Sequence, residues 1–198
     1  KALTVNVCIN QWSARKHDKK ITREVDDQHN AKDAGRYSKL LIAKEALQKI
    51  QKAANAARIF HYENTLPWSD NGDRLLPSAN YFAYITEMNR LKGDFEKEVI
   101  NFLAGYPDTL DDAKIRLNGL FNSADYPSEV EIKNKFGFKT EFMPLPDTDF
   151  RLDLSQTEIN NLTLSVENAM KDRINNAVKD TWKRIKERLK KSTAKGLE

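Results

Sequence analysis

The C-terminal part of the chain carries a long helical pattern that constrains the fold more than any other stretch. Apolar residues recur at steps of three and four over 155–191, which predicts one helix of about 36 residues. Ser155 and Glu158 have the spacing of a capping box, which places the start of this helix. A helix of this length seldom stands alone, so other helices or a second copy of the chain must cover its apolar stripe. The stripe comprises Ile159, Leu162, Val166, Ala169, Met170, Ile174, Val178, Trp182, Ile185 and Leu189.

Length and composition bound the class of protein. The 198 residues are 39% hydrophobic and 31% charged, which is ordinary for a helix-rich soluble chain. No apolar run approaches the roughly 18 residues of a membrane span, so we expect no membrane association. A lone Cys8 excludes an internal disulfide, and no signal peptide is recognisable, so we expect a cytoplasmic protein. We predict a single domain over 1–198, with the helix at about 156–191 either packed within it or projecting from it.

The charge is unevenly distributed along the chain, although the formal net charge is only +4. Residues 1–25 carry six Lys or Arg against two acids, and residues 31–62 carry seven against two. Residues 93–131 reverse this balance with nine acids against three bases, and residues 171–198 carry ten bases against four acids. The basic segments could contact nucleic acid, pair with the acidic middle of the chain, or form solvated helix faces.

The N-terminal region has the alternating pattern of strands. Apolar and polar residues alternate from Leu3 to Ile9, which predicts a strand over about 3–14. A basic cluster follows at 15–20, and Ile21, Arg23 and Val25 alternate again, so we predict a hairpin with a basic tip. That tip could enter a nucleic-acid groove or remain a solvated turn.

The rest of the chain predicts more helices than strands. Helical periodicity covers about 32–62, 78–103, 108–121 and 125–135, and its aromatic row at 81–103 is either core or a stacking platform for single strands. Alternation over 136–142 and 150–154 predicts two late strands. The predicted fold is therefore α+β and predominantly α-helical, with long amphipathic helices packed on a small antiparallel sheet that includes the N-terminal hairpin.

A distinctive loop over 65–77 lies between two helical segments. Asn71 and Gly72 supply the positive φ angles of a tight turn. Leu66 and Trp68 either anchor the loop on the core or form an exposed contact for a partner, so we keep both as candidate partner-binding residues. The acidic residues of the loop depart from calcium-loop spacing, and we predict no metal site.

Recognisable catalytic patterns are missing from the sequence. It has no phosphate loop, dinucleotide glycine pattern, zinc-spaced Cys/His set or nucleophile elbow. The histidines lie in separate segments, and a helix would point His61 and Glu63 apart. We therefore expect no enzyme and no cofactor, and we rank a hydrolase with a spatially assembled carboxylate site last.

Several stretches resemble a family of tailed-phage proteins of unknown function, which are sometimes encoded near MoxR-type ATPase and von Willebrand A-type genes. The resemblance implies a phage-encoded protein in the cytoplasm of the infected host, and it implies no catalytic residues. It rests on Trp12-Ser13-Ala14-Arg15-Lys16, on Ala-Arg-x-Phe-His-Tyr-x-Asn-Thr-Leu-Pro-Trp over 57–68, on Asp70-Asn71-Gly72-Asp73-Arg74-Leu75-Leu76-Pro77, on Tyr126-Pro127-Ser128 and on the segment 136–146.

Two functional hypotheses follow. The first is a non-enzymatic adaptor or inhibitor that docks on a larger phage or host protein or nucleoprotein assembly, with counter-defence as one role and self-association through the last helix as another possibility. The alternative is direct DNA or RNA binding by the basic hairpin tip and the basic end of the last helix. Its candidate residues are Arg15, Lys16, Lys19, Lys20, Lys183, Arg184, Lys186, Arg188, Lys190 and Lys191.

Overall fold

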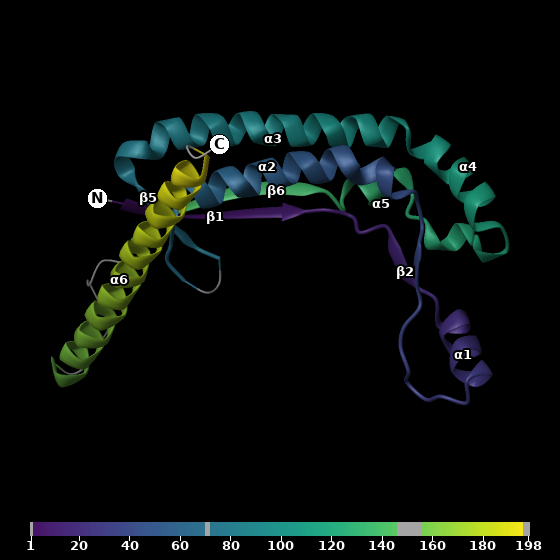
Figure 1. Ribbon diagram of the computed structural model, residues 1–198, viewed down its shortest axis with the longest axis horizontal. Coiled ribbons are helices and arrows are strands. Elements are labelled where there is room, and N and C mark those ends of the chain that lie inside the picture. The colour runs from purple at the N-terminus through teal and green to yellow at the C-terminus, as the bar shows by residue number, and fades with distance from the viewer. Residues whose placement is uncertain (1, 70–71, 146–155, 196–198) are drawn as a thin grey trace. The chain divides into compact units, whose positions relative to one another are not determined.

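A computed structural model describes the backbone of residues 2–69, 72–145 and 156–195. Helices dominate and a small antiparallel sheet accompanies them (Figure 1), so the predicted α+β, predominantly helical class is confirmed. Side chains are described over the same ranges except at 156–159, 161–163 and 190–195.

The elements follow one another in mixed order along the chain. Short 3-10 turns at Lys44–Leu47 and Ser78–Asn80 precede two of the long helices. The strands and helices are β1 (Ala2–Asn10), β2 (Arg15–His17), α1 (Lys19–Gln28), β3 (Ser38–Leu40), α2 (Gln48–Asn64), β4 (Leu66–Pro67), β5 (Arg74–Pro77), α3 (Tyr81–Ala104), α4 (Tyr106–Leu117), α5 (Glu129–Lys133), β6 (Gly137–Pro144) and α6 (Gln156–Lys195).

The chain forms two compact units, each assembled from separated segments. Unit 1 contains the described residues of 1–7, 58–88 and 139–198, and unit 2 contains 8–57 and 89–138. Four elements, β1, α2, α3 and β6, supply residues to both units. The expectation of one domain over the whole chain stays a prediction, as does a projecting last helix.

Unit 1 is built around a four-stranded sheet with the order β4-β5-β1-β6. Strands β1 and β5 pair antiparallel, with Val5 opposite Arg74. Strands β4 and β5 also pair antiparallel, and Gly72 between them has a φ of +95°, as the predicted tight turn requires. Leu76 and Val5 are almost fully buried, so the sheet presents one apolar face to the core.

An aromatic cluster covers this sheet from the helices. Tyr84 of α3 is 2% exposed, and its ring centroid lies 5.4 Å from that of Phe60 on α2. Phe142 of β6 makes edge contacts with both Tyr81 and Tyr84. The aromatic row of α3 is therefore largely core rather than a stacking platform, although Phe82 is 78% exposed.

A buried polar network ties α2 to the β4–β5 hairpin within unit 1. The Nδ1 atom of His61 lies 2.7 Å from the hydroxyl oxygen of Tyr84. The hydroxyl of Thr65 donates to the main-chain carbonyl of His61, and the guanidinium of Arg74 donates to both the hydroxyl and the carbonyl of Thr65. Burial and the positive charge of Arg74 lower the pKa of His61 to about 4, so this imidazole is neutral in the folded protein.

Unit 2 has its own aromatic core. Trp12 packs against Phe102 and Tyr106, with ring centroids 6.4 and 6.2 Å apart. Phe136 contacts Phe102 edge-on, and the hydroxyl of Tyr106 donates to the carbonyl of Pro127. Segments far apart in the sequence thus converge on the residues that follow β1.

A buried lysine joins three segments of unit 2. The ammonium of Lys39, which is 5% exposed, lies 2.6 Å from a carboxylate oxygen of Asp125 and 3.5 Å from one of Asp18. It also donates to the carbonyl of Leu120 at 2.8 Å. Burial alone would lower the pKa of Lys39, but the hydrogen bonds and charges of Asp125 and Asp18 together outweigh it and raise this pKa.

The predicted return strand at 21–25 is wrong, because these residues lie in helix α1. An N-terminal antiparallel pair exists, but β2 forms it with β3, with Arg15 opposite Leu40. Ile21 and Val25 are four residues apart, a spacing that fits a helix face as well as alternation. Asp18 favours the helix, because its carboxylate caps the N-terminus of α1 by accepting hydrogen bonds from the amides of Lys20 and Ile21.

The predicted helix at 32–62 begins too early. Residues 38–40 form β3, and α2 starts only at Gln48 after a 3-10 turn. The guanidinium of Arg116 donates to the main-chain carbonyls of Leu40 and Leu41. The hydroxyl of Tyr126 donates to the same carbonyl of Leu41. In a helix these carbonyls would accept hydrogen bonds from amides of the same helix. Here they accept from distant side chains instead, so the segment stays extended.

The remaining predicted elements are confirmed where they are described. Helices over 78–103 and 108–121 correspond to α3 and α4, the strand over 136–142 to β6, and the long last helix to α6. The helix predicted over 125–135 is shorter than expected, because Asp125 ends a 3-10 turn and α5 covers only Glu129–Lys133. The strand at 150–154 and the cap residue Ser155 lie outside the described residues. A capping box does occur at the start of α5, between Ser128 and Glu131.

Replacing Lys39 with Met should destabilise the protein by about 2 to 4 kcal/mol, because two carboxylates would lose their buried cation. Lys16→Met is the matched control. The Lys16 side chain is 54% exposed and lies 3.8 Å from Asp125, so its loss should cost less than about 1 kcal/mol. Urea unfolding measures both values, and equal effects would contradict a structural role for Lys39.

The stability of the protein should fall as the pH is lowered from 6.5 towards 4. His61 is neutral when folded but protonated when unfolded in this window, so unfolding takes up a proton and becomes easier in acid. The loss should reach about 2 kcal/mol at pH 5, since one pKa unit corresponds to about 1.36 kcal/mol.

Urea unfolding at a series of pH values tests this dependence. His61→Asn should flatten the curve between pH 6.5 and 5, whereas His29→Asn, at an exposed site, should leave it unchanged. A curve that His61→Asn does not alter would show that another group causes the acid sensitivity.

Candidate interaction face of the C-terminal helix

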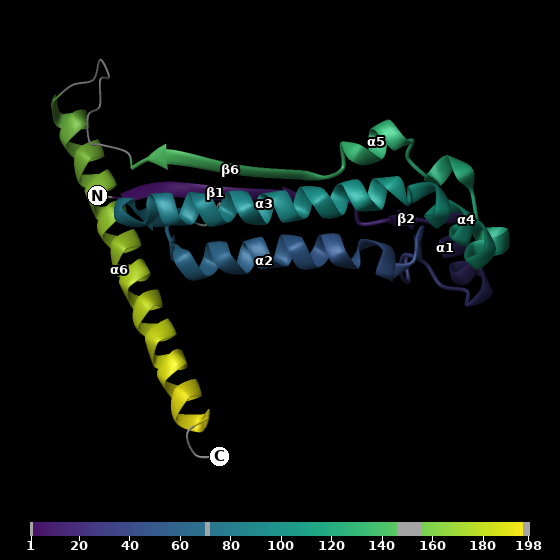
Figure 2. The same cartoon turned by 90° about the horizontal axis from the view of Figure 1, so that it is seen from above.

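Helix α6 is the longest element of the chain. Its 40 residues would extend about 60 Å at 1.5 Å per residue, and the segment contains no Gly or Pro to interrupt it. Figure 2 shows it as one unbroken helix. Its two ends differ in charge, because the bases are concentrated after residue 170.

The inner side of α6 is fixed to unit 1 by one small residue and two arginines. Ala177 is 3% exposed, which allows close approach to the helix. The guanidinium of Arg173 lies over the ring of Trp68, 5.4 Å from its centroid. Arg184 donates to the main-chain carbonyl of Tyr62 at 2.5 Å and forms an ion pair with Asp180 at 2.7 Å.

The opposite side of α6 exposes an apolar stripe, which we call the outer face. Its members follow one another at steps of four, four, three and four residues, so they lie on one side of the helix. Each is between 42% and 61% exposed, unlike the residues of an ordinary packed helix face. The outer face consists of Ile174, Val178, Trp182, Ile185 and Leu189.

Lysines border the outer face. Lys179, Lys183 and Lys186 surround Trp182 and, with Glu187, line an open hollow of about 570 Å³. Lys179 and Lys186 are three residues before and four residues after Trp182, so they share its side of the helix. Trp182 is 60% exposed, so an aromatic surface and ammonium groups are presented together.

The predicted nucleic-acid residues are divided between the two units. Arg15 and Lys16 lie in β2 and Lys19 and Lys20 in α1, all in unit 2, whereas the other candidates lie on α6 in unit 1. No single basic hairpin tip is formed, because α1 replaces the expected return strand. The side chains of Lys190 and Lys191 lie outside the described residues.

Three of these candidate cations already have partners within the chain. Lys16 pairs with Asp125 and Lys20 with Glu24, each at 3.8 Å. Arg184 contributes its guanidinium to the attachment of α6. The other described candidates, Arg15, Lys19, Lys183, Lys186 and Arg188, are exposed, and the last three lie together on α6.

Trp68 is 6% exposed, in agreement with the anchor interpretation of the 65–77 loop. Leu66 is only partly exposed and pairs with Leu75 across β4 and β5. Their role in binding a partner stays a prediction.

The five residues of the outer face were predicted as part of one apolar stripe, but the sequence left open whether other helices or a second copy of the chain cover it. Arg173, Ala177 and Arg184 lie on a separate side of the helix, together with the half-buried Val166 and Met170, and this side makes the internal contacts. Charged residues at helical spacing usually indicate a helix face that is exposed to solvent. The arginines of α6 therefore gave no sign that their side of the helix makes the internal contacts. The useful signal was a second series at steps of four, three and four residues, formed by Arg173, Ala177, Asp180 and Arg184.

Comparison of the chain with family models, with curated proteins and with solved structures finds no match. Among the described residues, no helix has both the length and the apolar character needed to cross a bilayer. In the same part of the chain, His, Cys, Asp and Glu do not gather into a group of three or more that could hold a metal ion.

Replacing Arg184 with Gln should destabilise the protein by about 1 kcal/mol, because the carbonyl of Tyr62 and the carboxylate of Asp180 would both lose a charged donor. Arg188→Gln, at an exposed position one turn further along α6, should change the stability by less than about 0.5 kcal/mol. Thermal unfolding compares the two variants, and equal stabilities would mean that the inward contacts of Arg184 contribute nothing.

Proposed function

We propose that the protein is a non-enzymatic interaction protein that docks the outer face of α6 into an apolar groove with an acidic rim on a partner protein. The observation that carries this proposal is the exposure of five large apolar residues along one side of a regular helix. Contiguous apolar surface of this kind is uncommon on surfaces that face only water.

The chemistry of the outer face favours a protein as the occupant. Fully burying a Leu, Ile or Val side chain stabilises a complex by about 1.5 to 3 kcal/mol, and nucleic acid offers little apolar surface to bury an aliphatic stripe. An amphipathic helix lying in a groove is a common mode of recognition, with anchors at the three- and four-residue steps that the outer face displays.

Charge identifies the rim of that groove. Residues 171–189 contain seven bases against three acids, so a second copy of the helix would bring two positive surfaces together. An acidic rim would instead pair with Lys179, Lys183 and Lys186. Self-association through α6 is thus the less favoured form of the interaction hypothesis.

The resemblance to tailed-phage proteins suggests that this docking takes place in a phage-infected cell. In a phage-infected cell, such a helix would serve an adaptor within a phage assembly or an inhibitor of a host complex, including one that acts in defence. Both roles need a rigid helix with one face committed to the parent protein and one face available.

Nucleic acid is the second candidate partner, and one observation favours it. Trp182 is 60% exposed among three lysines, and a base could stack on the indole while the ammonium groups neutralise phosphates. Such binding would leave most of the aliphatic residues of the outer face in water, so it ranks below a protein groove.

Fluorescence anisotropy with three labelled probes tests the proposal. The probes are a synthetic amphipathic helix with a Leu seam and Glu flanks, the same helix with Gln flanks, and a single-stranded oligonucleotide. We expect the Glu-flanked helix to bind at least tenfold more tightly than the Gln-flanked one, with a preference that shrinks as salt is added. Trp182→Ala with Ile185→Gln should abolish this binding.

Matched variants separate the alternatives. Lys179→Glu with Lys186→Glu should remove the preference for Glu flanks, whereas Lys49→Glu with Lys52→Glu, at exposed positions on α2, should not. Tighter binding of the oligonucleotide than of either helix would replace the proposal with nucleic-acid binding. A concentration-dependent dimer that Trp182→Ala disrupts would replace it with self-association.

A further inference from the structure

Asn118, which directly follows α4, has a main-chain conformation that residues with a side chain rarely adopt. Its φ is +45° and its ψ is −119°. Asn tolerates a positive φ better than most residues, but the accompanying ψ is usually about +30 to +60°. Backbone outliers of this kind persist only where the surrounding structure holds them, and they cluster at functional sites.

Two main-chain hydrogen bonds hold Asn118 in this conformation. Its amide donates to the carbonyl of Lys114 in the last turn of α4. Its carbonyl accepts from the amide of Phe121 at 2.9 Å. Because the peptide groups on both sides of Asn118 are engaged, its φ and ψ have little freedom to relax.

The ψ angle places the amide nitrogen of Gly119 where a five-membered ring can close. Viewed along the Cα–C bond of Asn118, the nitrogen and the Cβ on its Cα are about 120° apart. At a ψ of −119° the nitrogen of Gly119 therefore eclipses Cβ. Cβ, Cα, the carbonyl carbon and that nitrogen then share one plane, as they must in a planar imide ring. Only rotation about χ1 is still needed to bring Cγ to the nitrogen.

The surroundings of this pair leave room for the ring. Asn118 and Gly119 are both exposed, and a Cβ added at Gly119 would meet no atom within 4 Å. Gly119 has no side chain to hinder approach to its nitrogen. Within the described part of the chain, no hydrogen bond restrains the carboxamide of Asn118. The side chain is therefore free to rotate towards the main chain.

We propose that Asn118 and Gly119 form a site of self-modification, at which Asn118 is converted to aspartate and isoaspartate through a cyclic imide. The amide nitrogen of Gly119 gives its proton to solvent and attacks Cγ of Asn118. The new C–N bond replaces the bond from Cγ to the carboxamide nitrogen, which leaves as ammonia after taking a proton from water. Water then adds to one of the two imide carbonyls and breaks its bond to nitrogen. Cleavage at Cγ gives aspartate, and cleavage at the main-chain carbonyl gives isoaspartate.

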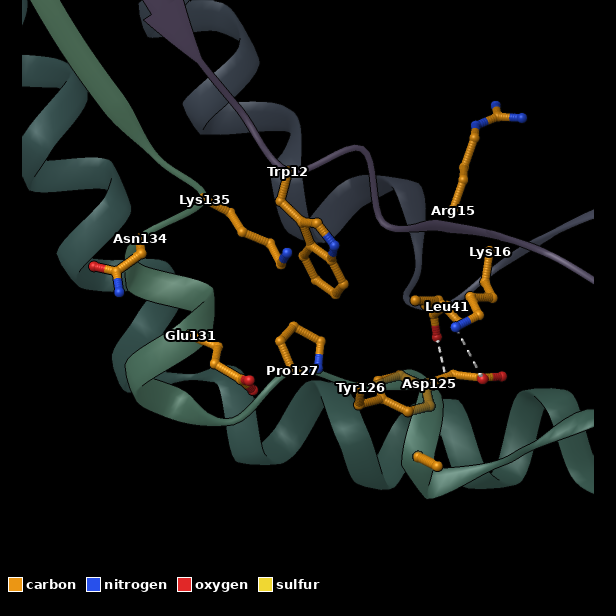
Figure 3. A pocket seen from close by; sticks show the side chains of 11 residues that line it. Trp12, Arg15, Lys16, Leu41, Asp125, Tyr126, Pro127, Glu131, Asn134 and Lys135 are labelled. Carbon is orange, nitrogen blue, oxygen red and sulfur yellow. Dashed lines mark hydrogen bonds and ion pairs between the residues drawn. The ribbon is translucent and has the colours of Figure 1, made fainter.

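Conversion to isoaspartate alters the turn beside the buried network of Lys39. It lengthens the main chain by one methylene just before Leu120, whose carbonyl accepts a hydrogen bond from the ammonium of Lys39 at 2.8 Å. That ammonium also pairs with Asp125, which Figure 3 shows together with Lys16 in the wall of a pocket. A reaction at an exposed turn thus reaches the ion pairs inside unit 2. The inference is independent of the outer face of α6, because the turn belongs to unit 2.

Peptide mapping by mass spectrometry tests the proposal on the whole protein during incubation at mildly alkaline pH. A synthetic peptide with the sequence of residues 112–124 gives the rate without the fold. Asn118 should convert at least about fivefold faster in the protein than in the peptide, because the fold already supplies the eclipsed geometry. Both aspartate and isoaspartate should appear, since direct hydrolysis of the carboxamide would give aspartate alone.

Asn122 is the internal control, because it lies in the same peptide and is also exposed. Its ψ of 115° turns the next amide nitrogen away from Cβ, and its side chain accepts a hydrogen bond from the amide of Ala124. Asn122 should therefore convert more slowly in the protein than in the peptide.

Gly119→Ala tests the attacking nitrogen. The added methyl group should slow the conversion of Asn118 at least about tenfold, because it hinders approach to that nitrogen. Gly93→Ala makes the same exchange at an exposed position on α3 and should leave the rate unchanged. A Cβ has no neighbour within 4 Å at either position, and circular dichroism establishes that both variants are folded.

Four results would overturn the inference. Persistence of intact Asn118 would show that the turn is unreactive, and a rate no higher than that of the peptide would show that the fold does not promote the reaction. Aspartate without isoaspartate would exclude the imide. An unchanged rate in Gly119→Ala would show that the nitrogen of Gly119 is not the attacking group.

Discussion

The hydrogen bond from Arg184 to the carbonyl of Tyr62 is one of the contacts that hold α6 against the rest of unit 1. Arg173 over Trp68 and Ala177, buried between the two arginines along the helix, lie on the side of α6 that faces inward. A helix can commit only one side to its own unit, so this attachment leaves the apolar stripe exposed. The proposed interaction function depends on this arrangement, because the large apolar residues from Ile174 to Leu189 remain on the surface.

In unit 2, the ion pairs of Lys39 connect separated segments. Its buried ammonium holds Asp18 and Asp125 close together, and Asp18 in turn caps α1. The same ammonium donates to the carbonyl of Leu120, and Lys16 approaches Asp125 from the surface. Two cations and two carboxylates from separated segments thus balance one another inside unit 2.

Much of the fold was predictable because several segments have strong, single periodicities. The helices α3 and α6 and the strands β1 and β6 follow from spacing alone. The errors lie where the spacing fits a strand and a helix equally well, or where tertiary hydrogen bonds compete with those of a helix. Ile21 and Val25 fit both a strand and a helix, and the carbonyls of Leu40 and Leu41 are taken by Arg116. Of the candidate site, the basic end of α6 and its apolar stripe were predicted, but the sequence left open whether other helices or a second copy of the chain cover that stripe.

The sequence by itself determined the helix-rich class, the length of α6 and the concentration of bases in its second half, because composition and periodicity act locally along the chain. Only the tertiary structure decided that Arg184 is used internally while Lys183 and Lys186 remain exposed, and that Arg15 and Lys135 line one pocket. The physical reason is that the role of a charged or apolar side chain depends on which groups from distant segments reach it. Neighbours along the chain do not specify those groups.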